Sequence, residues 1–377
     1  MIYFDNAATT KVSESVISAM VDLLRNKYFN PSSLYDLGIE VEKLLDESRK
    51  TVAGFLGVDA KNLFFTSCGT EGNNLAIFSN LTGRDDEEFV TSDIEHSSVY
   101  KTYKHIGGSR KVHFVNIGDD FKVDDIIDKV NNKTALVSIM QVNNETGRIL
   151  PIEEIGQRIK EKNPRTLFHV DGIQGYGKIR LDLNKAKVDF YTASGHKIHA
   201  SKGIGLLYAR HPERIRPLMY GGSQEGGVSP GTENTAGIVG FKVASQEAFN
   251  NLEENYKRLY ELKKYLMESI EEKISDVYFN SGLEGYSPYI TNVCFKGIKS
   301  EVLLHSLEAD GIYISTGSAC NKNAKSRIIE SIKTPEEYAD GCIRISFTDY
   351  SSKQEVDEFI DRLVFHVENI RKVMGRS

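Results

Sequence analysis

The sequence predicts an α/β protein with a large domain, in which helices flank a mostly parallel central sheet, and a smaller α+β domain. Three observations favour this fold class. Short apolar runs alternate with segments of helical spacing through the first two thirds of the chain. The chain has 377 residues, which is more than one hydrophobic core usually covers. The last third changes to a different mixture of strands and helices.

The predicted strands of the large domain are short apolar runs that end in polar or turn-forming residues. They are at 62–67, 87–92, 111–117, 134–141, 166–171, 188–194 and 203–210. Segments such as 70–81 and 151–162 lie between them, and their apolar residues recur at helical spacing. This alternation is typical of a parallel sheet with helices on both faces.

The C-terminal part of the chain predicts the second domain. A charged segment at 234–274 has helical periodicity and links the two domains. Strands are expected at 290–297 and 342–347. A helix is expected to begin at Ser352, where "SKQE" is typical of a capping box. We expect a large domain of residues 12–250 and a small domain of residues 1–11 and 251–377.

Composition excludes several classes of protein. Apolar residues make up 40% and charged residues 27% of the chain, as in ordinary globular enzymes. The net charge of -6 argues against a nucleic-acid partner. No apolar run reaches the roughly 18 residues of a membrane span, and "MIYFDNAATTKV" does not resemble a secretory signal. The four cysteines show no CxxC spacing, so we expect no metal site, free thiols and a cytoplasmic location.

Polar residues that follow predicted strands could bind a phosphorylated, cationic cofactor. Gly69 and Thr70 lie between a strand and a helix, where free N–H groups favour phosphate. Asp171 ends a strand, with Gln174 one turn later, and an acid there could hold a cationic ring nitrogen. An ordinary turn and a capping Asp remain the alternatives.

The stretch "SGHKIHASKG" places three polar groups at another strand end, namely Ser194, His196 and Lys197. An amine in that position can form an imine with a carbonyl cofactor if burial lowers its pKa. A solvated lysine is the alternative. A phosphate seat, an acid and a lysine in this order together indicate pyridoxal 5'-phosphate.

Further candidates follow other predicted strands. His96 could stack on the pyridine ring and move protons. Asn143 and Asn144 could bind a phenolic oxygen or a substrate carboxylate. Arg344 lies between apolar residues, where a guanidinium suits a carboxylate partner. Cys320 lies in the small, polar stretch "STGSACNKNAK", which is unusual for a buried structural cysteine.

Taken together, these motifs resemble the NifS/IscS-like cysteine desulfurases, a branch of the class V aminotransferase family of fold-type I pyridoxal phosphate enzymes. The resemblance runs from "YFDNAATT" to "CIRISF", over nearly the whole chain. The other matching pieces are "FNPSSLYDLG", "FTSCGTEGNN", "IEHSSV", "VNNETG", "HVDGIQGYGK", "SGHKIHASKGIG", "GTEN" and "STGSAC".

The resemblance implies a role for each residue around the cofactor ring. Lys197 would hold the cofactor as an imine and act as the base on the substrate. Asp171 would pair with the ring nitrogen, and His96 would stack on the ring. Gln174 and Asn144 would reach the phenolic oxygen.

The resemblance also implies the phosphate contacts. Gly69, Thr70, Ser194 and His196 would bind the phosphate of the same subunit. Thr232 would reach the phosphate of the other subunit in a homodimer.

The substrate contacts and the sulfur chemistry are implied in the same way. Arg344 would grip the carboxylate of L-cysteine, with Asn6 and Asn144 close by. Cys320 would attack the substrate sulfur and become a persulfide, while L-alanine is released. The 344 − 320 = 24 residues from Cys320 to Arg344 resemble the long-loop branch, which implies transfer to an iron–sulfur scaffold or to tRNA-thiolation proteins.

Two departures from the family pattern lie close to the expected phosphate contacts, and a third is "NKNAK" after Cys320, where small hydroxyl residues are common. Ser229 and Pro230 replace the usual Arg-Ser pair, which removes a positive charge near the site. Cys68 replaces a small residue beside the phosphate loop, and we interpret it as a filler.

Three other functions remain open. A selenocysteine lyase, another lyase or an aminotransferase of the same fold would share most of these residues. A cofactor-free cysteine hydrolase would use Cys320 with a histidine but would leave Lys197 and Asp171 unexplained. A non-catalytic assembly protein would have no use for Lys197 or Asp171.

Overall fold

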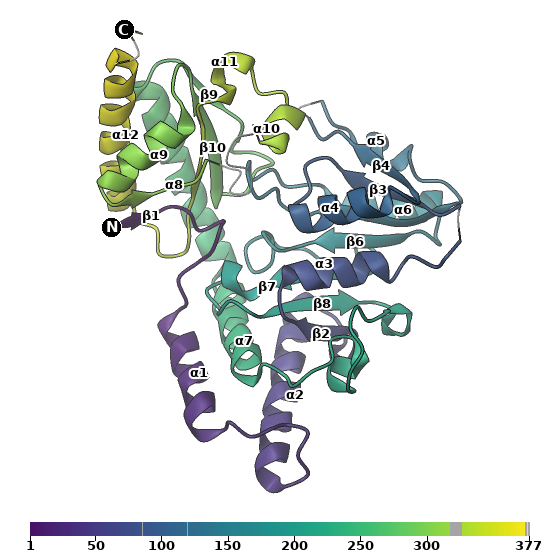
Figure 1. Ribbon diagram of the computed structural model, residues 1–377. Coiled ribbons are helices and arrows are strands. Elements are labelled where there is room, and N and C mark those ends of the chain that lie inside the picture. The colour runs from purple at the N-terminus through teal and green to yellow at the C-terminus, as the bar shows by residue number, and fades with distance from the viewer. Residues whose placement is uncertain (85, 119, 317–325, 374, 376–377) are drawn as a thin grey trace.

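The computed structural model describes the whole chain except residues 85, 119, 317–325, 374 and 376–377. Its largest element is a seven-stranded sheet (Figure 1). The strands are β2 (Leu63–Thr66), β3 (Glu88–Ser92), β4 (Lys111–Val115), β5 (Thr134–Met140), β6 (Leu167–Asp171), β7 (Phe190–Ser194) and β8 (Gly205–Ala209). Each lies inside one of the predicted runs, so the strand predictions are confirmed.

The strands lie in the order β2-β8-β7-β6-β5-β3-β4. All neighbours are parallel except β8, which is antiparallel to β2 and β7. The mostly parallel sheet is therefore confirmed. The carboxyl ends of the six other strands meet at one edge, where ligands of such sheets collect.

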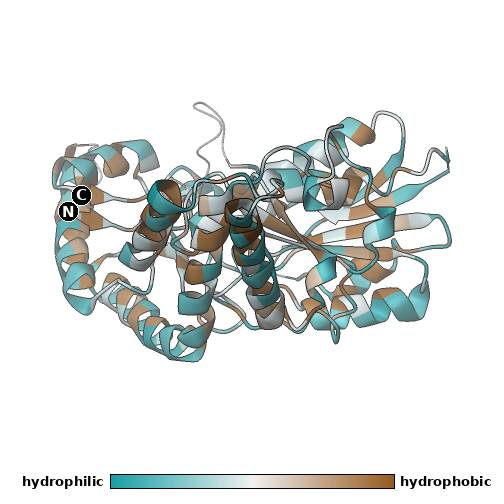
Figure 2. Cartoon of the chain, turned by 90° about the horizontal axis from the view of Figure 1, so that it is seen from below, coloured by the Kyte–Doolittle hydropathy of each residue, from teal (hydrophilic) through white to brown (hydrophobic). Residues whose placement is uncertain are grey.

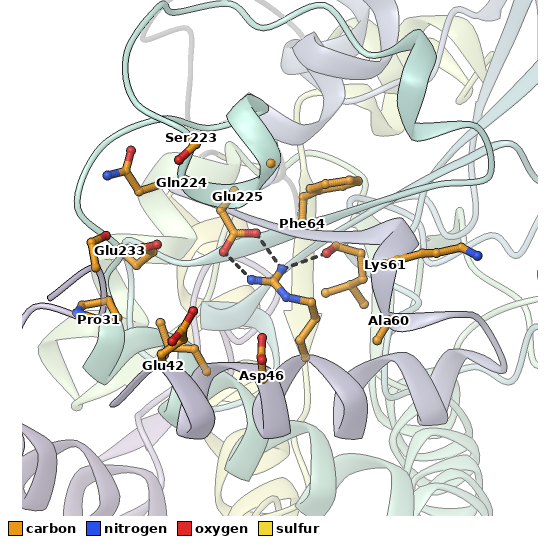
Figure 3. A pocket seen from close by; sticks show the side chains of 15 residues that line it. Pro31, Glu42, Asp46, Ala60, Lys61, Phe64, Ser223, Gln224, Glu225 and Glu233 are labelled. Carbon is orange, nitrogen blue, oxygen red and sulfur yellow. Dashed lines mark hydrogen bonds and ion pairs between the residues drawn. The ribbon is translucent and has the colours of Figure 1, made fainter. Parts of the chain in front are cut away.

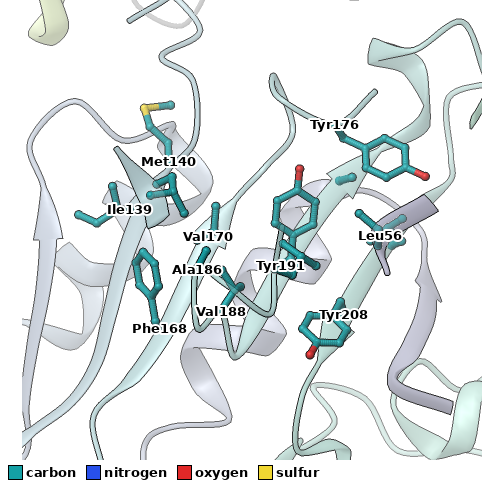
Figure 4. Packing of buried hydrophobic residues seen from close by; sticks show 14 of the residues in the cluster. Leu56, Ile139, Met140, Phe168, Val170, Tyr176, Ala186, Val188, Tyr191 and Tyr208 are labelled. Carbon is teal, nitrogen blue, oxygen red and sulfur yellow. The ribbon is translucent and has the colours of Figure 1, made fainter. Parts of the chain in front are cut away.

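Helices cover both faces of this sheet. They are α1 (Glu14–Asn26), α2 (Asp36–Leu56), α3 (Gly69–Phe78), α4 (Ser97–Ile106), α5 (Val123–Ile127), α6 (Ile152–Lys162) and α7 (Thr235–Asn250). Because strand side chains alternate between faces, Phe64 packs in the cluster of α3 and α4, whereas Phe65 packs in the cluster of α2, α6 and α7. Figure 4 shows part of the second cluster, with Phe168, Val170 and Tyr191 along the strands.

A separate hydrophobic cluster lies in the C-terminal part of the chain. Its elements are α8 (Leu252–Lys273), β9 (Val277–Phe279), β10 (Ile290–Phe295), α9 (Ser300–Ala309), β11 (Ile312–Tyr313), β12 (Cys342–Ser346) and α12 (Lys353–Val373). The short helices α10 (Arg327–Ser331) and α11 (Glu336–Ala339) lie in the same part of the chain and pack in other clusters. The N-terminal strand β1 (Ile2–Tyr3) pairs with β11, and Phe4 joins the cluster. Figure 2 shows apolar residues gathered on the central strands, and bands of both colours along the outer helices. Among the described residues, no helix is both long and apolar enough to cross a membrane.

The segment expected to be one long helix at 234–274 is two helices. The break is at Asn251, whose φ of -108° and ψ of 9° are not helical. Asn favours helix ends over helix interiors, because its side chain competes for backbone hydrogen bonds. The capping box before α12 is confirmed, since the Glu355 N–H donates to Ser352 Oγ and the Ser352 N–H donates to Glu355 Oε2.

Two of the cysteines expected to be free are joined. Cys294 on β10 lies directly opposite Cys342 on β12, and the two form a disulfide. The sequence offers no such pairing, because 48 residues separate the two positions and only the antiparallel register brings them together. Cys68 is a free thiol.

Candidate active site

A cavity of about 560 Å³ opens at the edge of the sheet where the parallel strands end. The loops after β2, β3, β5, β6 and β7 all reach it. Of the residues predicted from the sequence, the structure brings together Gly69, Thr70, His96, Asn144, Asp171, Gln174, Ser194, His196, Lys197 and Arg344 in its wall. These residues therefore gather around one cavity, as the strand-end reasoning predicts.

Lys197 follows β7 in a short 3-10 turn and points its amine into this region. Its Nζ donates to the carbonyl oxygens of Ala7 at 2.6 Å and Ala8 at 2.7 Å. Burial, followed by the charges of Arg344 and Lys178, lowers the pKa of Lys197 to about 7. A substantial fraction of the amine is therefore neutral near pH 7, as a nucleophile or base requires.

Asp171 ends β6 and is held by a chain of buried hydrogen bonds. Its Oδ2 accepts from Asn73 Nδ2 at 2.8 Å. Asn73 Oδ1 lies 3.2 Å from His169 Nε2, and His169 Nδ1 lies 3.0 Å from Ser138 Oγ. The Tyr103 hydroxyl continues the chain, 2.6 Å from Ser138 Oγ. Because the Asn73 amide nitrogen donates to Asp171, its oxygen must accept, which places the His169 proton on Nε2.

Burial sets the protonation of the groups in this chain. It lowers the pKa of His169 to about 3, so the ring is neutral. Burial raises the pKa of Asp171, and the charge of His96 and hydrogen bonds from the Ile173 N–H and Asn73 oppose that rise. The donors aimed at Asp171 thus favour its ionised form, which can pair with a cation.

His96 is the N-cap of α4 and is linked to Asp171 through Ser98 and Asn73. Asn73 Nδ2 also donates to Ser98 Oγ at 2.9 Å. Ser98 Oγ lies 2.8 Å from His96 Nδ1, and the Ser98 N–H donates to the same nitrogen. His96 Nδ1 is therefore an acceptor and the proton is on Nε2, while burial lowers the pKa of the ring below its ordinary value.

The predicted phosphate seat is formed around the start of α3. Gly69 is its first residue, and a Cβ there would lie 2.3 Å from Ile173 Cδ1. A larger residue at this position would force the Ile173 side chain to move. Ser194 ends β7 and is buried, and Thr70 is exposed. Burial lowers the pKa of His196 to about 4, so this side chain is neutral and its Nδ1 lies 3.2 Å from Thr9 Oγ1.

Two amides present unpartnered oxygens in the cavity wall. Gln174 Oε1 and Asn144 Oδ1 are buried and have no hydrogen-bond partner within the described part of the chain. Gln174 Nε2 is held by the Ala7 carbonyl at 2.9 Å. Buried polar atoms normally have partners, so these oxygens suit a bound ligand that donates to them.

Arg344 on β12 is already paired. Its Nη2 lies 2.7 Å from Asp5 Oδ1, and its Nη1 donates to the Asn144 carbonyl at 2.8 Å. Its Nε is buried and unpartnered among the residues that the structure describes. Asn6 does not line the cavity, since its Nδ2 donates to the carbonyls of Tyr3 and Ser346.

One further predicted residue, Thr232, is exposed and lies outside the wall of this cavity. Glu225 anchors the loop that carries Thr232. Its two carboxylate oxygens accept hydrogen bonds from Arg49 of α2 at 2.6 and 2.7 Å. This ion pair lies beside a second cavity of about 430 Å³ (Figure 3). Ser229 Oγ donates to Glu71 Oε1 at 2.7 Å. Cys320 lies outside the described residues.

Sequence reasoning missed several residues of the site. Asn73 and His169 position Asp171, while Glu95, Glu145 and Arg327 line the cavity. Four of them stand inside the quoted motifs "FTSCGTEGNN", "IEHSSV", "VNNETG" and "HVDGIQGYGK", one to three residues from a predicted site residue. That proximity was the available signal for Asn73, Glu95, Glu145 and His169.

Comparisons with known proteins agree with this fold and cavity. Residues 2–359 match the family model of class-V aminotransferases. The chain is 39% identical to a "Cysteine desulfurase" from Nostoc sp., over 98% of this chain and 94% of that protein. A solved NifS-like protein is 35% identical with a TM-score of 0.92, over 98% of this chain and 99% of that one. The structure of SspA in complex with cysteine is 28% identical with a TM-score of 0.80, over 93% and 100% of the two chains.

The fold and the strand-end cavity thus define a NifS-like protein of the fold-type I class. The chain belongs to the class-V aminotransferase family.

Proposed function

We propose that this protein is a cysteine desulfurase, which removes sulfur from L-cysteine and yields L-alanine and a persulfide on Cys320. The observation that carries the proposal is the convergence of Lys197, Asp171 and His96 on one cavity, in a chain that is 39% identical to a protein of that name. A cysteine hydrolase would leave the low pKa of Lys197 and the buried bonds to Asp171 without a purpose.

Pyridoxal 5'-phosphate fits the residues of the cavity. Its phosphate would bind at the start of α3 beside Gly69, and its phenolic oxygen would form a hydrogen bond with Gln174. Its aldehyde would react with the amine of Lys197. Its ring nitrogen suits the carboxylate of Asp171. When bound, the cofactor supplies an electron sink that weakens bonds to the substrate α- and β-carbons.

The protein's own side chains bind the substrate and move protons. Lys197, with a pKa lowered to about 7, takes the proton from the substrate α-carbon. His96 presents a protonated Nε2 and can donate to the substrate. Arg344 binds the α-carboxylate through its unpartnered Nε, with Asn144 beside it, and Asn6 holds the neighbouring backbone.

Cys320 receives the sulfur. Its thiolate forms an S–S bond with the substrate sulfur as the bond between carbon and sulfur breaks, and alanine takes up the proton. We propose an iron–sulfur scaffold or another sulfur-acceptor protein as the next recipient, and a cytoplasmic location, because a reducing compartment keeps Cys320 free. The Cys294–Cys342 disulfide is buried between two strands and leaves this role open to Cys320.

The proposal includes a homodimer and two domains. Exposed apolar side chains lie on two segments of the chain. They are Tyr28, Leu34, Tyr35 and Leu37 on the first segment, and Leu218, Met219 and Tyr220 on the second. Pro31 and Ser32 of the first segment line the same cavity as Ser223 and Gln224, which follow the second segment. Thr232 is exposed on the same loop, where it could reach the phosphate of a second subunit. Separate hydrophobic clusters support a division into residues 12–250 and residues 1–11 with 251–377.

The first experiment follows visible absorbance and product release. We expect the purified protein to be yellow, its absorbance to shift on addition of L-cysteine, and sulfide and alanine to appear. Cys320→Ala should keep the colour and the shift and lose most sulfide release, whereas Lys197→Ala should lose the ordinary absorbance. A colourless protein that cannot be reconstituted with pyridoxal 5'-phosphate would refute the cofactor. Desulfuration that does not need Cys320 would instead indicate a lyase.

A further inference from the structure

A second guanidinium, that of Arg327, faces the cavity, and nothing in the proposed reaction uses it. Arg327 begins α10 and lines the cavity. Its Nη2 donates to the Glu95 carbonyl at 2.5 Å, and its Cζ lies 3.8 Å from the centre of the Tyr100 ring. Its Nη1 is buried, and the described residues offer it no hydrogen-bond partner. A buried N–H without an acceptor is costly, so this arrangement suits a ligand that supplies one.

The acids near Arg327 do not fully neutralise it. Burial raises the pKa of Glu95 to about 8 and also raises the pKa of Glu145. Ser326 Oγ donates to Glu145 Oε2 at 2.6 Å. Glu95 is thus biased toward the uncharged form at neutral pH, while the guanidinium of Arg327 stays charged. This wall of the cavity therefore favours an anion.

Arg327 and Arg344 come from different elements and have different partners. Arg344 lies on β12 and is held by Asp5 and the Asn144 carbonyl. Arg327 is held by the segment that follows β3 and by α4. If Arg344 binds the α-carboxylate of the substrate, as proposed above, Arg327 is left for a negative charge elsewhere on the same molecule.

We propose that Arg327 is a substrate-binding residue that selects amino acids whose side chain carries a negative charge, such as the thiolate of cysteine. The inference rests on the proposed function for the identity of the substrate. A guanidinium beside the thiol favours its ionised form, because an opposite charge stabilises that form. The neutral side chains of alanine and serine gain nothing from the same contact.

Two ligands of nearly equal size, L-aspartate and L-asparagine, isolate the effect of side-chain charge. Their equilibrium binding to the cofactor-loaded Cys320→Ala protein is followed by visible absorbance and by the shift in melting temperature. We expect aspartate to bind at least about tenfold more tightly than asparagine, as a charge-assisted hydrogen bond allows. Arg327→Gln should abolish this preference and leave asparagine binding unchanged, and Arg327→Lys should restore part of it.

The control is Lys101→Gln, which removes a positive charge from an exposed residue at the border of the same cavity. It should keep the preference for aspartate. If Arg327→Gln weakened the binding of aspartate and asparagine equally, the proposal would be overturned, because Arg327 would then bind the α-carboxylate that both ligands share. A wild-type protein without preference, or without binding of either ligand, would also overturn it.

A kinetic readout separates this inference from the proposed function. In the protein with Cys320 intact, Arg327→Gln should raise KM for L-cysteine about tenfold or more and change kcat little, since the contact is made in the bound substrate. An unchanged KM would contradict the inference alone. Failure of the wild-type protein to release sulfide would contradict the proposed function, and the aspartate preference would still test Arg327.

Discussion

Glu95 shows how burial fixes the charge of a single residue in the cavity wall. It is fully buried, and one oxygen, Oε1, accepts from Ser92 Oγ at 2.6 Å and from the Met140 N–H at 3.0 Å. The other oxygen, Oε2, has no hydrogen-bond partner in the described part of the protein. Two donors on one oxygen and none on the other fit a neutral acid whose proton is on Oε2.

The raised pKa of Glu95 predicts a specific pH dependence of stability. Burial raises this pKa from 4.5 to about 8, so the stability that the neutral acid contributes is complete below about pH 4.5 and is lost as the pH rises toward about 8. Glu95→Gln keeps the neutral form at every pH. Its free energy of unfolding should therefore fall less than that of the wild-type protein between about pH 5 and about pH 8.

Urea denaturation of the cofactor-free protein at both pH values measures this difference. The control is Glu14→Gln, because the Glu14 side chain is 81% exposed and should follow the wild-type curve. If the free energy of unfolding of Glu95→Gln and of the wild-type protein changed equally with pH, Glu95 would be ionised in the folded protein.

At the scale of an element, a buried ion pair helps to hold the loop at 221–234 to the rest of the large domain. Glu225 bonds both Arg49 of α2 and the Phe65 N–H of β2, and Arg49 also donates to the Leu63 carbonyl. Glu225 has a φ of 49°, a left-handed conformation that a non-glycine residue rarely adopts. The ion pair therefore keeps the loop in a conformation that it would otherwise leave.

Breaking this pair should destabilise the protein and release the loop. Arg49→Met leaves a carboxylate of 4% exposure unpaired, which costs about 3 kcal/mol at the low end for buried pairs. Urea denaturation measures the loss, and limited proteolysis should show faster cleavage within 221–234. The matched control is Arg180→Met, which breaks an ion pair with Glu253 whose side chains are 74% and 72% exposed and should cost less than about 1 kcal/mol. Equal losses in the two variants would contradict the anchoring role.

At the scale of the whole molecule, the apolar surface of 28–37 and 218–220 is the feature that a single chain does not explain. Leu34 and Tyr220 are each 94% exposed. Apolar patches of this kind are typical of protein interfaces. A second copy of the chain would cover it and would bring an exposed Thr232 toward a neighbouring subunit.

Charged residues in this patch should dissociate the dimer. Leu34→Asp with Tyr220→Asp should halve the mass measured by light scattering and weaken the retention of pyridoxal 5'-phosphate, because the phosphate would lose a contact from the partner. Val302→Asp is the control, since Val302 is an exposed apolar residue of α9 outside the patch. A wild-type protein that is already monomeric would contradict the proposal.

The positions of the strands along the chain and several residues of the cavity wall could be predicted from the sequence. Asp171, Ser194 and Lys197 each follow an apolar run that ends in polar residues, and parallel strands bring such ends to one edge. This local relation between a strand and the residue after it needs no knowledge of the rest of the chain. The break at Asn251 was missed because helical periodicity continues on both sides of it.

The sequence by itself determined the α/β class, the strand ends and the residues that gather there, because periodicity and turn chemistry act over a few residues. Only the tertiary structure decided which distant groups support them. Asn73 reaches Asp171 across 98 positions, and Arg49 reaches Glu225 across 176. The Cys294–Cys342 pair and the position of Arg327 over the Tyr100 ring likewise depend on packing between elements. Such contacts are fixed by how strands and helices pack in three dimensions, and separation along the chain carries no trace of them.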